Sequence, residues 1–187
     1  SSGTLATTLG LALASSATAL AWGVAWLETA PPRWDVRLRR VAYLPLVLPS
    51  VLWVVGLHRL ALAWHLDGQW AGLWLAHTLA ALPYVLIALT PAFTGYDARY
   101  GQVAASLGHS RLHFVTRVKW PMLRASLASA LAVGVGVSVA QYLPTLYVGA
   151  GRVATVTTEA VTLASGGQRS MLAAFAWLQW TLPVLAF

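Results

Sequence analysis

Charged residues and cysteine are what this 187-residue sequence has least of. Only 9% of its residues are charged, 58% are hydrophobic, and the mean hydropathy is +0.68. Soluble domains average about 25% charged residues, so too few are present here to cover the apolar content with a hydrated surface. The composition argues against a cytosolic globule, a disordered tail or a nucleic-acid module, and it predicts a protein that crosses a membrane several times. The absence of cysteine excludes disulfides, thiolate metal sites and cysteine nucleophiles.

Familiar catalytic signatures are missing as well. The sequence contains no phosphate-binding P-loop, no Gly-x-Ser-x-Gly nucleophile motif and no His-Glu-x-x-His zinc motif. His109 and His113 have the i, i+4 spacing of a metal-binding pair, but no third ligand accompanies them, which favours a solvated loop face. We therefore predict no catalytic residue, no metal site and no cofactor, and ATP hydrolysis is not expected of this chain.

Long apolar runs are what the sequence does contain. A membrane-spanning helix needs about 20 mostly apolar residues. Five segments reach or approach that length: residues 4–27, 41–63, 71–93, 125–148 and 171–187. Backbone in lipid must satisfy its own hydrogen bonds, and Leu and Ala favour helices, so the prediction is an all-α transmembrane bundle of about five helices. Prolines inside these runs are interpreted as tolerated kinks.

The 12 Lys and Arg residues fall between the apolar runs and predict an orientation. Nine of them lie in segments 33–40 and 99–124, whereas Arg59, Arg152 and Arg169 lie in other gaps. Positive residues accumulate on the cytoplasmic side of membrane proteins, so both segments are predicted to be cytoplasmic. This placement accounts for the net charge of +7 without nucleic acid. Because the sequence starts without Met and stops inside an apolar run, we interpret residues 1–187 as one transmembrane domain truncated at both ends.

The segment 94–123 is polar and differs from the rest of the sequence. It predicts two short helices, the first capped by Asp97 and ended by Gly108 in a left-handed turn, the second capped by Ser110. The first helix has an apolar stripe at i, i+3, i+4 and i+7, formed by Tyr100, Val103, Ala104 and Leu107. A helix–glycine–helix elbow of this kind is typical of a docking knob for another protein, or of an amphipathic segment lying on the membrane surface. The pattern alone does not separate the two.

The residues of the elbow are more informative than its shape. The run Gln-Val-Ala-Ala-Ser-Leu-Gly at 102–108 is followed by Val-Lys-Trp-Pro at 118–121. These runs resemble the EAA loop of binding-protein-dependent ABC importer permeases, whose pattern is Glu-Ala-Ala, three residues, Gly, nine residues, then Ile-x-Leu-Pro. The spacing matches throughout, and so does the position after the third predicted span. Within this family the sequence looks closest to the fused permeases of the iron, thiamine and phosphonate type.

The resemblance implies that residues 94–121 form a cytoplasmic loop that couples the permease to an ATPase. The residues at the matching positions are the predicted coupling residues: Gln102, Val103, Ala104, Leu107, Gly108, Val118 and Pro121. The family has Glu at the position of Gln102, so the contact here would lack that charge. Val103 and Trp120 are further departures from the family pattern.

The resemblance also implies a set of partners. They are a cytoplasmic ABC ATPase subunit, a periplasmic or extracellular substrate-binding protein, a second permease core that is fused or a separate copy, and the lipid of the inner (plasma) membrane. The chain would form the translocation pathway and perform no chemistry. An ion-driven secondary transporter is an alternative, but it would need carboxylates at mid-membrane, which the predicted spans lack. An integral-membrane enzyme is a second alternative, but it would need a cluster of His, Asp or Glu.

Three polar residues in the predicted spans are candidates for lining the pathway. His77 lies in the third span, where a hydrogen bond between helices is the favoured alternative. Gln141 and Tyr142 lie in the fourth span, and for Gln141 plain packing is an equal alternative. Residues 154–164 predict a short outer helix, whose Glu159 either contacts the binding protein or is solvated.

Overall fold

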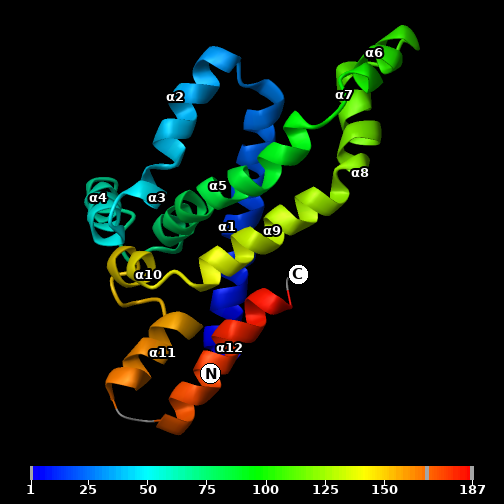
Figure 1. Cartoon of the computed structure of the whole chain (residues 1–187). Helices are drawn as coiled ribbons and strands as arrows, with labels where there is room; N and C mark the ends of the chain where they lie inside the picture. Colours follow the sequence, from blue (N-terminus) through cyan, green and yellow to red (C-terminus); the bar gives the residue numbers. More distant parts are fainter. Residues whose placement is uncertain (1, 167–168, 186–187) are drawn as a thin grey trace.

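The computed structural model describes residues 2–166 and 169–185, which form helices joined by short turns (Figure 1). No strand occurs in these two ranges, so the predicted all-α class is confirmed. The helices in chain order are α1 (Ser2–Thr29), α2 (Pro32–Ala42), α3 (Leu44–Val47), α4 (Ser50–Ala63), α5 (Trp70–Thr94), α6 (Arg99–Ser106), α7 (Arg111–Phe114), the π-helix η1 (Val115–Lys119), α8 (Trp120–Met122), α9 (Arg124–Val139), α10 (Leu143–Val148), α11 (Val156–Ser165) and α12 (Arg169–Val184).

Three helices that are distant in sequence, α1, α5 and α9, pack on one another at the centre of the molecule. Their shared core consists of Ala19, Ala81, Leu82, Val85, Leu86, Leu89 and Ala130. Small residues allow the close approach of α1 and α9, since a Cβ atom added to Gly134 would lie only 3.0 Å from the Cβ of Ser16. The centre is therefore held by close packing of apolar and small side chains.

Two helices are long and apolar enough to cross a membrane, at Gly3–Thr29 and Trp70–Thr94. These confirm the first and third predicted spans. A third span results if the helix Arg111–Met122 and α9 are counted together, although they meet at a bend of 74°. Two or three candidate spans are thus present in the described residues, against the five predicted.

The second predicted span is wrong as a single helix. Residues 41–63 are divided among the end of α2, the four residues of α3 and the 14-residue α4. Leu48 is extended, with φ −80° and ψ 143°, because the proline ring of Pro49 disfavours helical geometry in the residue before it. Pro49 thus ends one helix rather than kinking it.

The fourth predicted span is also divided. The helix α9 ends at Val139, and α10 begins only at Leu143, so Gln141 and Tyr142 lie in the break between them. The fifth predicted span corresponds to α12, whose 16 residues fall short of the usual spanning length; Phe187 lies outside the described residues. The short helix predicted at 154–164 is confirmed as α11, where Thr155 and Thr158 form a capping box.

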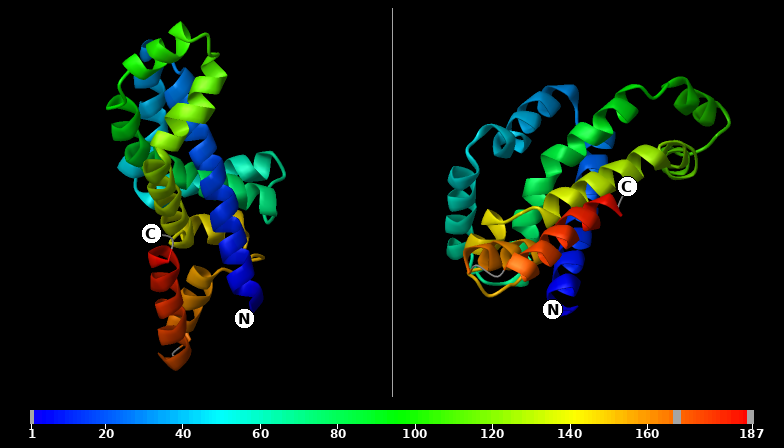
Figure 2. Two further views of the ribbon diagram at one scale, coloured as in Figure 1. Left: turned by 90° about the vertical axis from the view of Figure 1, so that its right-hand side faces the viewer. Right: turned by 60° about the horizontal axis from the view of Figure 1, so that its bottom comes forward.

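The positively charged segments lie at one end of the molecule. α1 runs from the N-terminus to this end, where α2 and the segment α6–α7 both lie (Figure 1). Arg152 lies at the opposite end, where it lines a pocket with the first residues of α1. The views of Figure 2 agree that α6 and α7 stand away from the central helices. The helix α2 and the segment α6–α7 thus lie far from Arg152.

Candidate functional site

The candidate site is the elbow, which we define as α6, α7, η1 and α8, residues 99–122. Its first helix begins beside Asp97, whose carboxylate accepts a hydrogen bond of 2.9 Å from the backbone N–H of Arg99. The N-cap position itself is Ala98, so Asp97 accepts this bond one residue ahead of the cap. The side chains of Asp97 and Arg99 also form an exposed ion pair of 2.8 Å.

Gly108 makes the turn between the two helices of the elbow. Its φ is +79°, in the left-handed region where a side chain is strained. The N–H of His109 reaches back to the carbonyl of Ala104 at 3.0 Å, which closes the end of α6. Ser110 then caps α7 by accepting the backbone N–H of His113 at 3.2 Å. Both predictions, the glycine stop and the serine cap, are confirmed.

The second half of the elbow is one rod, Arg111–Met122, that includes a π-helical turn. The π turn covers Val115–Lys119, which contains Val118, and α8 contains Pro121 in its first turn. The sharp bend into α9 follows at Leu123. The chain therefore changes direction two residues after Pro121.

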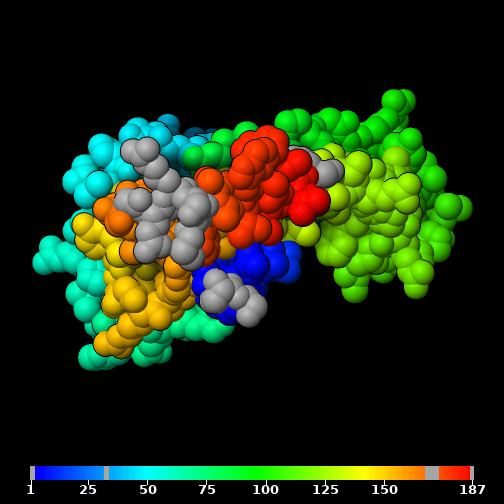
Figure 3. All heavy atoms as spheres, turned by 90° about the horizontal axis from the view of Figure 1, so that it is seen from below, coloured from blue at the N-terminus to red at the C-terminus, as the bar shows by residue number. Residues whose placement is uncertain are grey.

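The tip of the elbow exposes apolar side chains. Val103 is 57% exposed, Leu107 69% and Leu112 74%, while Ala104 is buried. Of the predicted apolar stripe on α6, only Ala104 thus faces inward. Figure 3 shows the green atoms of this segment extending to the right, beyond the other helices. An exposed apolar tip that stands clear of its own bundle is suited to contact another surface.

Aromatic rings hold the two halves of the elbow together. Tyr96 lies 5.7 Å from the ring of Tyr100 and 6.3 Å from that of Phe114, measured between ring centroids. A Cβ atom on Gly101 would lie 3.5 Å from the Phe114 ring, so α6 and α7 are in contact there. Burial raises the pKa of the Tyr96 phenol, and nearby Tyr100 and acidic groups raise it further. The elbow is therefore a packed unit with a neutral aromatic centre.

The predicted histidine pair is present but incomplete as a metal site. The rings of His109 and His113 stack with centroids 4.5 Å apart. Within the described residues no group of three His, Cys, Asp or Glu side chains is placed to hold a metal ion.

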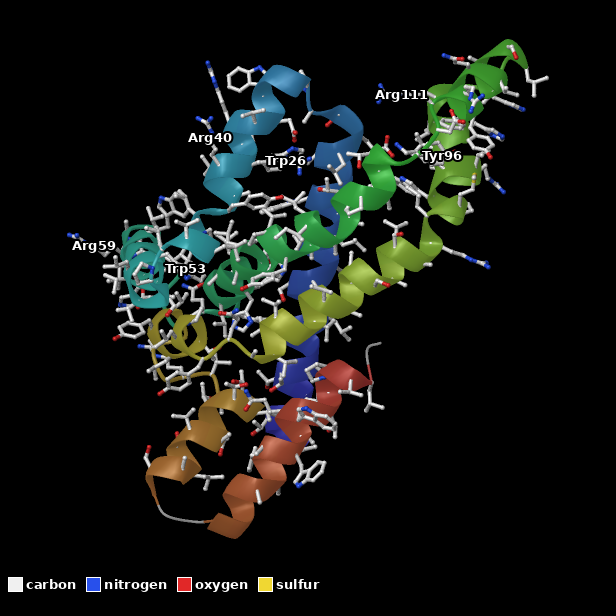
Figure 4. All side chains as sticks on the ribbon, in the orientation of Figure 1. Trp26, Arg40, Trp53, Arg59, Tyr96 and Arg111 are labelled. Atoms are coloured by element: carbon white, nitrogen blue, oxygen red, sulfur yellow. The ribbon has the colours of Figure 1, made fainter. Side chains whose placement is uncertain are left out.

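The rod is attached to the end of α1 by polar contacts, which the sequence reading missed. The Nζ atom of Lys119 lies 2.9 Å from Oε1 of Glu28, and both side chains are mostly buried. Arg111 donates a hydrogen bond of 2.7 Å to the backbone carbonyl of Glu28. Figure 4 shows Arg111 and Tyr96 near this attachment, at the end of the elbow that adjoins the bundle. No sequence spacing identifies such a pair, because its members are 91 residues apart.

A second polar cluster fastens α2 to the same end. Trp26 donates a hydrogen bond of 2.7 Å to Asp35, and the Nε atom of Arg39 lies 2.8 Å from the same carboxylate. Arg39 also donates to the hydroxyl of Thr90 on α5, at 3.0 Å. Burial raises the pKa of Asp35, but the hydrogen bonds of Arg39 and Trp26 and the charge of Arg39 outweigh it, and the pKa is lowered. The cytoplasm-facing end predicted from the charges is thus tied together by ion pairs and hydrogen bonds.

The three pathway candidates are brought near one another but differ in setting. His77 is 1% exposed, and its ring nitrogens lie 2.8 Å from the Ser138 hydroxyl and 2.9 Å from that of Thr145. It therefore bridges α5, α9 and α10, which agrees with the favoured alternative of a hydrogen bond between helices. Gln141 and Tyr142 are half-buried in the break between α9 and α10.

The partners of His77 were missed by the sequence reading. Ser138 receives a further hydrogen bond of 3.1 Å from Ser15 of α1, and the Thr145 hydroxyl donates to the carbonyl of Gln141 at 2.6 Å. Isolated Ser and Thr residues in apolar runs are common, so nothing in the sequence distinguishes these. The result is a buried polar network through the centre of the bundle that ends at the helix break.

Comparison with known proteins adds one relative. No family model matches the chain. Over 183 residues, 98% of its length, the chain is 40% identical to the inner membrane ABC transporter permease protein YnjC of Escherichia coli (strain K12). The match covers 35% of that protein, so the chain spans about a third of the length of the curated relative it matches.

Proposed function

We infer that the chain is part of a permease subunit of an ABC importer in the inner membrane. The observation that carries this inference is the elbow itself: an exposed apolar tip around a left-handed Gly108, on a segment whose spacing resembles an EAA loop. The similarity to the permease named above supports the transport class. The charge distribution supports a cytoplasmic elbow.

In this proposal the elbow seats in a separate ATPase subunit. Val103, Leu107 and the neighbouring Gln102 would contact the ATPase, and Gly108 would set the angle between the two helices. Ala104 would keep α6 close to the body of the elbow. Val118 and Pro121 would position the rod that leads to the bend before α9.

Transport would then follow from movement of the helices. An ATPase dimer closes on ATP, the elbow moves with it, and the bundle shifts between inward-open and outward-open forms that differ by a few kcal/mol. A loaded substrate-binding protein outside the membrane and a second permease core would complete the transporter. Gln141 and Tyr142, in the break after α9, would line the pathway. His77 would hold this segment in place through the Thr145 hydroxyl, which donates to the carbonyl of Gln141.

Cross-linking tests the docking of the elbow directly. Residues 1–187 contain no cysteine, and cysteines elsewhere in the full-length permease are replaced first. The variant Leu107→Cys in this background, expressed with its ATPase, should cross-link to the ATPase subunit. Trp64→Cys is the matched control, since Trp64 is 62% exposed, close to the 69% of Leu107, but follows α4, away from the elbow. It should give no such product.

The same variants separate docking from the alternative of a segment on the membrane surface. In intact cells, an impermeant thiol reagent should leave Leu107→Cys unlabelled until the cells are opened. Labelling from outside would contradict the cytoplasmic orientation. Cross-links from position 107 to lipid alone, at every stage of the ATP cycle, would contradict the docking role.

A further inference from the structure

We propose that Glu28 and Lys119 form a joint that transmits movement of the elbow to α1, so that both are positioning residues for transport. This inference rests on the proposed function, because it requires that the elbow be moved by an ATPase. It goes beyond that function by naming the residues that pass the movement on.

The geometry of the pair suits this role. Nζ of Lys119 lies 2.9 Å from Oε1 and 3.0 Å from Oε2 of Glu28, so the ammonium contacts both oxygens. The side chains are 14% and 13% exposed, respectively. Water and salt screen such a pair far less than an exposed one, and loss of one partner leaves the other charge buried and unpaired.

A second contact from the rod reaches the same residue of α1. Arg111, the first residue of the rod, donates to the backbone carbonyl of Glu28 at 2.7 Å. Lys119 lies about two turns further along the rod. Two contacts separated along the rod thus meet at one residue of α1 and resist sliding of the rod along that helix.

Lys119 also contacts the end of α5. Its ammonium lies 4.7 Å from the centre of the Phe93 ring and 5.5 Å from that of Tyr96. These are cation–π distances. The lysine thus occupies a three-way junction between α1, the last part of α5 and the elbow. A force on the elbow reaches both central helices at this point.

The local backbone supports the assignment. Lys119 is the last residue of the π-helical turn, and it is the single lysine of the sequence. A π turn inserts one extra residue into a helix and is found frequently at functional sites. The other ion pair of this region, Asp97–Arg99, is exposed and joins two neighbours in one segment, so it cannot connect the elbow to α1.

The experiment uses the full-length permease reconstituted with its ATPase and binding protein. Transport, ATP hydrolysis and the Leu107→Cys cross-link are measured in Glu28→Gln, Lys119→Met and the charge-swapped Glu28→Lys/Lys119→Glu. Each single variant should lose roughly tenfold in transport per ATP hydrolysed, because without the ion pair, movement of the elbow is no longer passed to α1. The cross-link to the ATPase should persist. The charge swap should recover most of the loss, and Lys119→Arg should stay close to the parent protein.

The matched control is Arg117→Met, which removes a cation from the same π turn. Arg117 is exposed and lies two residues before Lys119. Its transport per ATP should not change. A merely structural role for the pair would lower transport and ATP hydrolysis together with the amount of folded protein. Uncoupling would lower transport per ATP hydrolysed at an unchanged amount of folded protein.

Normal coupling in both single variants, with the cross-link present, would overturn the joint and leave the proposed function standing. Equal loss of transport and hydrolysis, unrepaired by the swap, would also overturn it. Absence of the cross-link in the parent protein would instead overturn the proposed function, and the joint with it.

Discussion

The centre of the bundle and the elbow place their polar and apolar side chains in opposite ways. In the centre, α1, α5 and α9 bury polar groups, and His77 uses both ring nitrogens within a network of hydroxyls. In the elbow, apolar side chains such as Leu107 and Leu112 are exposed at the tip. Buried polar groups that are satisfied fix one arrangement of helices. Exposed apolar groups are typical of surfaces that bind another protein or a membrane. The comparison indicates that His77 and its hydroxyl partners in the centre are satisfied within the chain, whereas the elbow presents apolar side chains to its surroundings.

The largest effect is expected in the elbow, from Gly108→Asp. We expect transport to be lost while the protein still inserts, because Asp adds charge and bulk to the docking tip at a residue with φ +79°. Transport and membrane content are measured together. Normal substrate-stimulated ATP hydrolysis in this variant would remove the elbow from the coupling path.

The matched pair Gly108→Ala and Gly56→Ala isolates the backbone contribution. No heavy atom lies within 4 Å of a Cβ added at either glycine, but only Gly108 has a positive φ. Gly108→Ala should destabilise its turn by about 1–2 kcal/mol. Gly56→Ala, inside α4, should be neutral or slightly stabilising.

In the centre, Gly134→Val should have the largest effect. Its Cβ would lie 3.0 Å from Ser16 and 3.2 Å from Val85, so α1, α5 and α9 would be pushed apart. We expect a loss of about 1–3 kcal/mol of stability, measured as a lower midpoint of thermal unfolding in detergent. Gly10→Ala is the control, because nothing lies within 4 Å of the added Cβ. An unchanged midpoint in Gly134→Val would mean that the helices are not closely packed there.

His77→Leu tests whether the buried network is structural. The substitution leaves the hydroxyls of Ser138 and Thr145 without their histidine partner, which should cost about 1–3 kcal/mol of stability. His77→Gln, which can still hydrogen-bond, should lose less. A change in substrate preference at full stability would instead place His77 in the pathway.

The smallest effect is expected for Asp35→Asn, at about 1 kcal/mol or less. The pKa of Asp35 is lowered below its ordinary value near 3.8, so its ion pair contributes stability above that pH. The contribution is lost as the pH falls through the lowered pKa in the folded state. The difference in unfolding midpoint between the parent and Asp35→Asn should therefore be present at pH 7 and disappear in acid. A difference that persists unchanged in acid would assign it to packing rather than charge.

Local features of the elbow could be predicted from the sequence, but its setting could not. Asp97, Gly108 and Ser110 act on backbone groups within a few residues, so their roles follow from neighbouring positions alone. The exposure of three members of the α6 stripe, and the burial of Ala104 alone, depends on where the elbow stands relative to the bundle. Hydrophobic periodicity identifies the apolar face of a helix but does not say which element packs against that face.

The spans show the same division. Segments 4–27 and 71–93 were predicted correctly because a continuous apolar run needs nothing else to favour a helix. Segments 41–63 and 125–148 have similar composition but are each divided into separate helices. In the second segment, the helix after the break, α10, packs against α4 and α5. Whether a proline or a short polar stretch bends a helix or ends it depends on the partners available to the freed backbone groups.

The sequence by itself determined that the chain is helical and that the elbow turns at Gly108. These properties follow from composition and from residues close together in the chain. Only the tertiary structure decided which hydroxyls meet His77 and that Lys119 reaches Glu28. Those contacts join residues 61 to 91 positions apart, and they form only when packing of the apolar helices brings distant polar groups within hydrogen-bonding distance.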